Sequence, residues 1–319
     1  MNKTVSVGNY LWLLIATLSA GVLVLGCGGS DNKEGNGEIT IGASMLSMQN
    51  EFVVNVRDAM AEEAKKQGIN FLVNDAQRSA LNQLQHVESF IAQGVDAIIL
   101  NPVEVEASSP AVDLAKRSGI PIINVNSETS SDPTAFVGSD DVRAGEMAME
   151  FISDKLDGSG NVLMIQGYMG QAAQIKREQG ANNILEQSPG LALLASQTAE
   201  WDRATAMSLM ENWIQSYGDE IDAVFAHNDE MGLGALEALE NAGMSEDVIL
   251  ISIDGIQDAL QAVREGRLDA TVFQDAKGQG TMAIQTALKI ISEDSTYQKE
   301  VLIPFKTVTQ ENVEEFIGF

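Results

Sequence analysis

Apolar and polar positions alternate regularly along the chain from Glu38 onward. Short apolar runs, such as Ala97–Leu100 and Val248–Ile251, are followed by longer segments whose apolar residues recur every three or four positions. The short runs are typical of strands buried on both faces, and the longer segments are typical of amphipathic helices. Repeated alternation of the two predicts an α/β protein with parallel sheets covered by helices on both faces.

The pattern divides into two successive series. The first series predicts strands at 39–45, 70–73, 96–100, 121–125 and 136–138, with helices at 53–67, 79–93, 107–118 and 142–156. The second series predicts strands at 161–165, 191–197, 223–226, 248–253 and 270–274, with helices at 172–187, 204–217, 230–239, 257–265 and 280–292. Segment 94–101 resembles segment 220–228, so we expect two similar lobes whose strand ends face a shared cleft.

Segment 222–239 shows the order of strand, turn and helix most clearly. The predicted buried strand 223–226 turns at His227, Asn228 and Asp229 and then continues as a helix. Asp229 suits the helix N-cap, because its carboxylate can accept from the free amides of the first turn. Asn228 then lies at the carboxyl end of a strand, where open α/β sheets bind their ligands.

Polar and aromatic side chains recur at or near the predicted strand ends. Amides donate and accept, carboxylates accept, arginine donates through a planar fork, and an aromatic face can cover the C–H face of a ring. Such residues can also simply form turns, caps or core contacts. Together they predict a site for a neutral, hydroxyl-rich ligand, formed by Asn50, Phe52, Asn126, Arg177, Trp201, Asn228, Asp254 and Gln274.

The first 26 residues differ from the rest, because Lys3 is their only charged residue and 10–26 is almost wholly apolar. This segment resembles a bacterial lipoprotein signal peptide that ends before Cys27, the single cysteine, which would carry the lipid. A polar, glycine-rich tether is expected at 27–37. The formal net charge of −27 argues against a nucleic-acid partner, because the chain would repel phosphates.

An enzyme is the second class of function, and the sequence gives it little support. Segment 278–283 fits the dinucleotide pattern G-x-G-x-x-A, but no strand with an acidic ribose ligand follows it. The chain shows no P-loop and no metal-binding cluster. His86 and His227 are its only histidines, and we expect His227 to face away from the cleft if Asn228 faces into it. A DNA-binding regulator would need a basic head before the two lobes, and the expected export signal stands there instead, so we do not expect a regulator. We also predict neither an enzyme nor a cofactor.

Several ordered motifs resemble the ribose-binding protein family, periplasmic sugar-binding proteins of ABC importers, over roughly 38–319. They are Asn50-Glu-Phe52, 119–126, Lys176-Arg177-Glu178, Trp201-Asp-Arg203, 227–231, Ile253-Asp-Gly255 and 270–274. The resemblance implies that the eight residues above contact the ligand. Asn126-Ser127 stands where ribose binders have Asp-Arg, and Val53 where they have a second phenylalanine. A pentose, a hexose or a cyclic polyol such as inositol is therefore an open alternative.

The resemblance also implies the architecture and the partners. We expect the type I periplasmic binding protein fold, with an N-terminal lobe at 38–139 plus 275–302, a C-terminal lobe at 140–274 plus 303–319, and a three-strand hinge between them. The expected protein is exported, lipid-anchored and monomeric, and delivers its ligand to an ABC permease. A receptor that reports to a chemoreceptor or a sensor kinase is the alternative within this class.

Overall fold

The structure is a computed structural model that describes residues 38–318. The predicted signal peptide 1–26, the tether 27–37 and the lipidation site Cys27 lie outside the described residues. Among residues 38–318, no helix combines the length and the apolar character needed to cross a bilayer.

The first sheet contains six strands within the described part of the chain, in the order β11-β5-β4-β3-β1-β2. All of its pairings are parallel. The strands are β1 (Thr40–Met45), β2 (Asn70–Asp75), β3 (Ala97–Leu100), β4 (Ile122–Val125), β5 (Ala135–Gly138) and β11 (Glu300–Leu302).

The second sheet repeats this order as β12-β10-β9-β8-β6-β7 within residues 38–318. Its edge strand β12 runs antiparallel to β10, which departs from the all-parallel prediction. The strands are β6 (Ser159–Gln166), β7 (Gly190–Thr198), β8 (Ala223–Ala226), β9 (Ile249–Asp254), β10 (Ala270–Phe273) and β12 (Lys306–Thr309). The doubly wound fold class is confirmed, and β11 and β12 are strands that the apolar pattern did not reveal.

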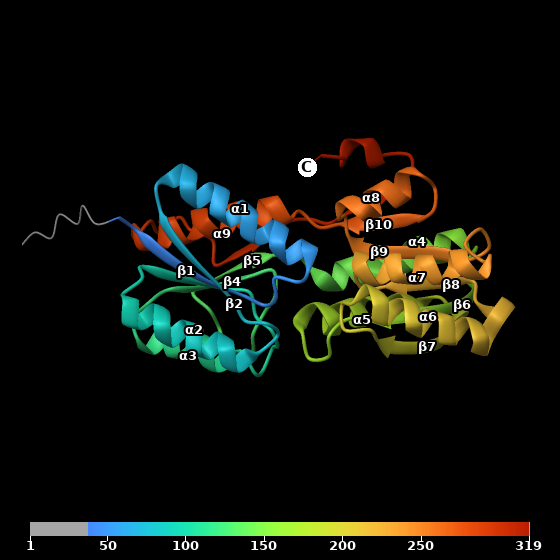
Figure 1. The fold of residues 1–319 in the computed structure, drawn as a ribbon, viewed down its shortest axis with the longest axis horizontal. Helices are drawn as coiled ribbons and strands as arrows, with labels where there is room; N and C mark the ends of the chain where they lie inside the picture. Colours follow the sequence, from blue (N-terminus) through green and yellow to red (C-terminus); the bar gives the residue numbers. More distant parts are fainter. Residues whose placement is uncertain (1–37, 319) are drawn as a thin grey trace, which may run out of the picture. The chain divides into compact units, whose positions relative to one another are not determined.

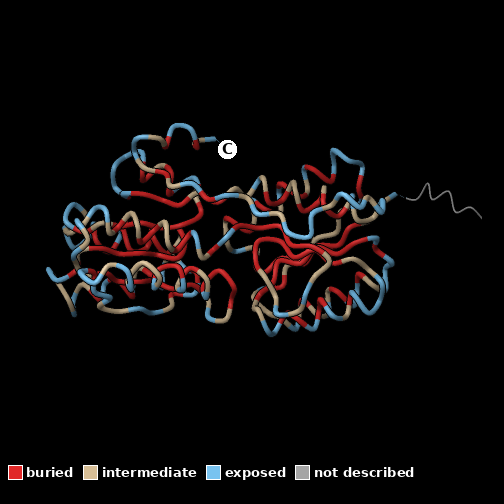
Figure 2. The backbone as a smooth tube through the Cα atoms, turned by 180° about the vertical axis from the view of Figure 1, so that it is seen from behind, coloured by how far each residue is buried: buried red, intermediate tan, exposed pale blue. Residues whose placement is uncertain are grey.

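Helices cover both sheets, as continuous apolar strands require (Figure 1). We call the first sheet with its helices the first lobe; they are α1 (Glu51–Gln67), α2 (Ala80–Gln93), α3 (Ser109–Arg117) and α9 (Ala276–Ile291). We call the second sheet with its helices the second lobe; they are α4 (Asp141–Lys155), α5 (Ala172–Gln187), α6 (Arg203–Tyr217), α7 (Asp229–Ala242) and α8 (Gln257–Arg264). Figure 2 shows the strands buried inside each lobe and exposed residues along the outer helices.

The chain passes between the two sheets three times. It leaves β5 for α4, returns from β10 to α9, and crosses again from β11 to β12. Gln279 on α9 donates to the Ser139 hydroxyl in the first crossover at 3.1 Å. The crossovers therefore lie close enough for a side chain of one to bond another, as expected of a shared hinge.

Helix α9 corrects one expected boundary and removes the dinucleotide motif. It begins at Ala276 rather than at residue 280, because the Asp275 side chain accepts from the Gly278 amide and caps the helix earlier. Both Gly278 and Gly280 therefore lie within the helix instead of in a phosphate-binding loop. A Cβ at Gly280 would lie 2.4 Å from the Val56 carbonyl oxygen, so this glycine permits close packing of α9 on α1.

Candidate ligand-binding site

A cavity between the lobes contains all eight residues predicted from the strand ends. The free space in it is small, about 30 Å³, because the lining side chains fill most of the gap between the lobes. The twelve lining residues add four that the sequence did not indicate, namely Leu46, Val53, Gln171 and Ala173. The structure thus brings the eight residues together, and their contact with a ligand stays a prediction.

The first lobe contributes neutral groups to this cavity. Asn50 precedes α1, and its side-chain oxygen accepts from the Val53 amide at 3.1 Å. Phe52, in the first turn of α1, is buried against the cavity. Asn126 follows β4 with φ +65°, and its oxygen accepts from the Asn101 amide at 3.3 Å. These residues lie where helix and strand ends meet the cleft, as expected for an open α/β sheet.

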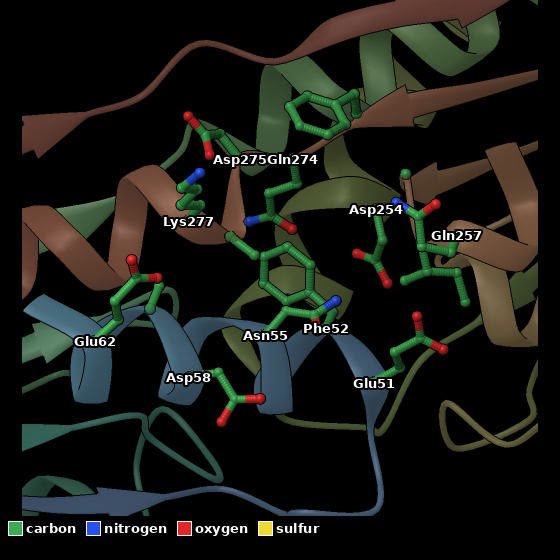
Figure 3. Close-up of a pocket in the computed structure, with 15 residues that line it drawn as sticks. Glu51, Phe52, Asn55, Asp58, Glu62, Asp254, Gln257, Gln274, Asp275 and Lys277 are labelled. Atoms are coloured by element: carbon green, nitrogen blue, oxygen red, sulfur yellow. The ribbon is translucent and has the colours of Figure 1, made fainter. Parts of the chain in front are cut away.

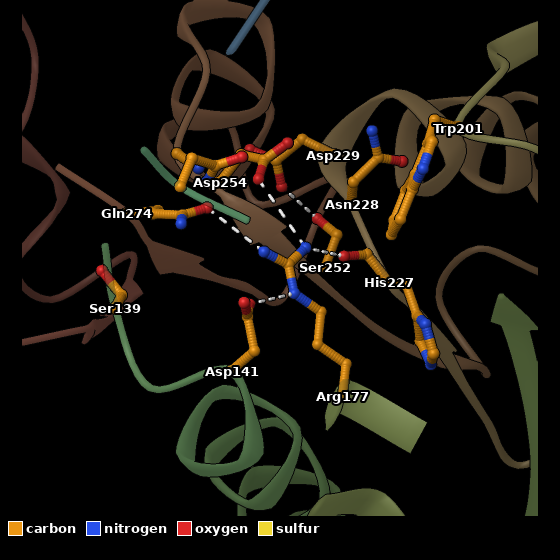
Figure 4. A network of polar contacts seen from close by, with 12 residues as sticks. Ser139, Asp141, Arg177, Trp201, His227, Asn228, Asp229, Ser252, Asp254 and Gln274 are labelled. Carbon is orange, nitrogen blue, oxygen red and sulfur yellow. Dashed lines mark hydrogen bonds and ion pairs between the residues drawn. The ribbon is translucent and has the colours of Figure 1, made fainter. Parts of the chain in front are cut away.

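The second lobe contributes a buried guanidinium, Arg177 on α5 (Figure 4). Its Nε donates to Asp141 at 2.8 Å, and one terminal nitrogen donates to Gln274 at 3.2 Å. The other terminal nitrogen donates to the His227 carbonyl and lies 3.8 Å from Asp254. Its side chain is only 3% exposed, so these bonds hold it in one orientation.

Asp254 is the cavity residue with the most perturbed electrostatics. Burial raises its pKa well above the usual carboxyl range, although the charge of Arg177 opposes the shift. The backbone at Asp254 has φ +139°, a conformation that non-glycine residues rarely adopt. Within residues 38–318 its side-chain oxygens accept no hydrogen bond, and Arg177 lies 3.8 Å away, so they are open to a ligand group that donates.

Trp201 forms one wall, and Gln171 fixes its orientation. The indole nitrogen donates to the Gln171 side-chain oxygen at 2.6 Å, and the ring lies 5.8 Å from the Arg177 guanidinium carbon. A Cβ at Gly167 would lie 1.9 Å from the indole, so a glycine is needed behind it. Gln171 has no strand-end signal, because it lies in the loop before α5; only its position near Arg177 in sequence could have suggested it.

The predicted capping role of Asp229 is wrong. Asn228 caps α7 instead, since its side-chain oxygen accepts from the Met231 amide at 3.0 Å. Asp229 occupies the first turn and accepts from the hydroxyls of Ser252 and Thr271 and from the amides of Gly255 and Ile256. Its carboxylate thereby holds the turn that carries Asp254.

His227 lies outside the cavity lining, as expected from the alternation along the segment. Its ring packs on Phe225 with centroids 5.0 Å apart and points away from Asn228 (Figure 4). Burial, and then the charge of Arg177, hold its pKa well below the usual histidine value. Within residues 38–318, no cluster of three His, Cys, Asp or Glu side chains is placed to bind a metal.

A larger hollow of about 960 Å³ lies beside the cavity and shares Phe52, Asp254 and Gln274 with it (Figure 3). Its other charged residues are Lys277 and four acids, Glu51, Asp58, Glu62 and Asp275. All eight predicted ligand residues line the smaller cavity, whereas the hollow contains three of them. The acidic hollow disfavours the approach of anions.

Two contacts join the lobes next to the cavity. Lys176, adjacent to Arg177, forms an ion pair with Glu128 at 2.6 Å. The Val105 amide donates to the Gly170 carbonyl at 3.0 Å. Both connect loops of the first lobe to the start of α5, so these contacts require the lobes to be close together.

Comparisons with known proteins agree with this architecture. Residues 41–295 match the family model described as periplasmic binding protein domain. The chain is 39% identical over 282 residues to the ribose import binding protein of Bacillus subtilis, covering 88% of this chain and 90% of the relative. It is 35% identical over 318 residues to a xylitol-binding protein of Mycolicibacterium smegmatis, covering 98% and 88%.

A solved structure supports the same conclusion. An ABC transporter solute-binding protein from Bacillus halodurans C-125, with bound myo-inositol, is 42% identical and superposes with a TM-score of 0.84, covering 88% of this chain and 97% of that one. The family is one of binding proteins, which agrees with the prediction that the chain is not an enzyme. The chain belongs to the periplasmic binding protein domain family and has its type I, two-lobed fold.

Proposed function

We propose that the chain is the solute-binding protein of an ABC importer and captures a sugar or a cyclic polyol between its lobes. The observation that carries this proposal is the cavity itself, where amides, Arg177 and Asp254 converge between the rings of Phe52 and Trp201. Relatives that bind ribose, xylitol and myo-inositol support the class of ligand. Delivery to a permease follows from the importer role.

The charge of the site favours a neutral ligand. Arg177 is already paired with Asp141 and lies near Asp254, so the cavity has no surplus positive charge for a phosphate or a dicarboxylate. The small cavity leaves no room for an oligosaccharide. The eight predicted residues are therefore proposed as the contacts of a single pyranose, furanose or cyclitol ring.

Capture is proposed to proceed by closure of two lobes, 38–139 plus 275–302 and 140–274 plus 303–319. The three crossovers are the natural hinge, because they are the segments through which the chain passes from one sheet to the other. Gln274 ends β10 at one crossover and accepts from Arg177, so the hinge adjoins the site. A ligand that contacts both lobes would stabilise the closed state.

The membrane attachment is proposed to run through a lipid on Cys27, with residues 1–26 removed and 27–37 as the tether. The surface charge of the chain supports a protein that binds no nucleic acid, and we expect it to act as a monomer. Changing Cys27→Ser should move the protein from the membrane fraction to the soluble fraction. A protein that still sediments with membranes would contradict the lipid anchor.

The test of the binding function is a thermal-shift screen of the protein against pentoses, hexoses, inositols and linear polyols. A ligand at 100 times its dissociation constant adds about 2.7 kcal/mol to stability, which shifts Tm by a few degrees. One strong hit, verified by calorimetry, supports the proposal and names the ligand. A complete panel with no shift would reject sugars and polyols as the ligand class.

A further inference from the structure

Five amide side chains line the cavity, and every one has its carbonyl oxygen engaged by the protein. The oxygen of Asn50 accepts from the Val53 amide, that of Asn228 from the Met231 amide, and that of Asn126 from Asn101. The oxygen of Gln274 accepts from Arg177, and that of Gln171 accepts from the Trp201 indole. The amides come from both lobes, yet they share this arrangement.

These bonds determine which way each amide points. Backbone N–H, guanidinium and indole groups can only donate, so rotating the amide of Asn50, Asn228, Gln274 or Gln171 would place two donors against each other. Asn101 is fixed in turn, because its own oxygen accepts from the Leu46 amide. The NH₂ groups are consequently the free ends of all five side chains.

None of the five NH₂ groups donates a hydrogen bond within residues 38–318. The nitrogens of Asn228 and Gln274 are buried and lack any partner, which costs free energy until something accepts from them. Asn50, Asn126 and Gln171 line the same cavity. A ligand in this cavity would meet five amide donors in addition to Arg177.

Acceptors are scarce by comparison. Among the twelve described residues that line the cavity, Asp254 is the one whose side-chain oxygens accept no hydrogen bond and face no rival donor closer than Arg177, at 3.8 Å. Each amide oxygen keeps a second lone pair, but one is already engaged, whereas the NH₂ groups donate nothing within the described residues. A polyol in this cavity therefore meets more free donors than free acceptors, which favours the use of most of its hydroxyls as acceptors.

We propose that this site selects its ligand by oxygen lone pairs, so that most ring positions must present an acceptor, whereas the position beside Asp254 must present a donor. This deepens the proposed function and rests on it. The substrate class is then an oxygen-rich ring in which carbonyl or ether oxygens can replace hydroxyls at most positions. Ammonium groups lack lone pairs and are accepted only beside Asp254.

The test measures affinities for inositol analogues in which one hydroxyl at a time is replaced by hydrogen, by a carbonyl or by an amino group. At positions that face the amides, the deoxy and amino analogues should bind about 10- to 100-fold more weakly, while the keto analogue stays within about threefold of the parent. At one position the order should reverse, with the amino analogue bound well and the keto analogue bound poorly. Equal losses for keto and deoxy analogues at every position would overturn the proposal.

A change in the protein, instead of in the ligand, tests the same selection. Gln171→Glu keeps the size of the side chain and the acceptor for Trp201 but replaces the free donor by an acceptor. The parent polyol should bind at least about tenfold more weakly, and the variant should favour the amino analogue relative to wild type. Gln49→Glu, at an exposed position outside the cavity lining, adds the same charge and should leave affinities unchanged.

The two proposals fail in different ways. If wild-type protein binds no polyol, the proposed function is rejected, and the replacement series is made on whichever ligand the screen identifies. If it binds the parent polyol but treats keto and deoxy analogues alike, only the selection by lone pairs is rejected. Matched losses in Gln171→Glu and Gln49→Glu would likewise count against it, since charge alone would then explain the effect.

Discussion

The two lobes repeat one strand order but bring different chemistry to the cavity. The first lobe contributes Asn50, Phe52 and Asn126, which carry no charge. The second lobe contributes Arg177, Asp254 and, behind them, Asp141 and Asp229, all of which are buried. A common topology therefore places residues at equivalent strand ends without deciding which side chains stand there.

The buried charges give the second lobe a fixed arrangement, and the first lobe has no such constraint. Buried charges require their partners at all times, because an unpaired charge in a dry interior is costly. The Arg177 bonds to Asp141 and to the His227 carbonyl lie within the second lobe and do not depend on closure. We infer that the second lobe orients the ligand and that the first lobe covers it.

The largest effect should come from removing the guanidinium. Arg177→Ala should weaken binding by about 2–3 kcal/mol, roughly 30- to 150-fold, and should also lower Tm because Asp141 loses its buried partner. Asn126→Ala in the first lobe should cost about 1 kcal/mol, or roughly fivefold. Calorimetry measures the ligand affinity of both variants. Equal losses of affinity would contradict the proposed difference between the lobes.

A smaller effect is expected for the aromatic wall of the second lobe. Trp201→Ala removes a ring that lines the cavity and should weaken binding by about 1–2 kcal/mol while the fold is retained. Phe52→Ala is the matched change in the first lobe. A Tm that collapses in Trp201→Ala would show that the indole stabilises the core rather than the complex.

The buried carboxylate should show opposite effects on stability and on binding. The pKa of Asp254 is higher in the folded state than in the unfolded state. Between these two pKa values the folded protein binds more protons than the unfolded chain. The free energy of unfolding therefore falls as pH rises from the ordinary carboxyl range to the raised pKa. Asp254→Asn removes this penalty and should raise the free energy of unfolding at neutral pH by about 1 kcal/mol.

The same Asp254→Asn variant should bind polyols more weakly, because it exchanges the acceptor for an amide. Its gain in Tm over wild type, measured without ligand, should shrink as the pH falls to about 4, where the unfolded carboxyl is protonated as well. A gain that does not depend on pH would mean that packing, not charge, is responsible.

The smallest effect concerns the pair that joins the lobes. Lys176→Ala should speed ligand release about two- to threefold at low salt, because the Glu128 ion pair is about one-third exposed and holds the lobes together. Lys299→Ala removes an exposed pair of similar length with Asp132, within the first lobe, and serves as the control. Stopped-flow fluorescence at low and high salt should show the difference fading with salt.

Sequence periodicity alone determined much of this molecule. Short continuous apolar runs between amphipathic helical segments are typical of strands buried on both faces, so the local pattern predicts the strand–helix order and the fold class. Polar residues at the ends of such strands must meet at one edge of the sheet, and all eight that were singled out line one cavity. The strands β11 and β12 escaped detection because they are short edge strands with mixed polarity.

Only the tertiary structure decided how those residues are used. Asn228 rather than Asp229 caps α7, because the hydroxyls of Ser252 on β9 and Thr271 on β10 donate hydrogen bonds to the Asp229 carboxylate. Gln171 is held at the cavity by a hydrogen bond that it accepts from the indole of Trp201, 30 residues away. The pattern indicates residue types, and backbone amides three residues away orient Asn50 and Asn228. The amides of Asn126, Gln171 and Gln274 are oriented by partners 25, 30 and 97 residues away. For that reason the donor-rich character of the site is a property of the folded chain and not of any one segment.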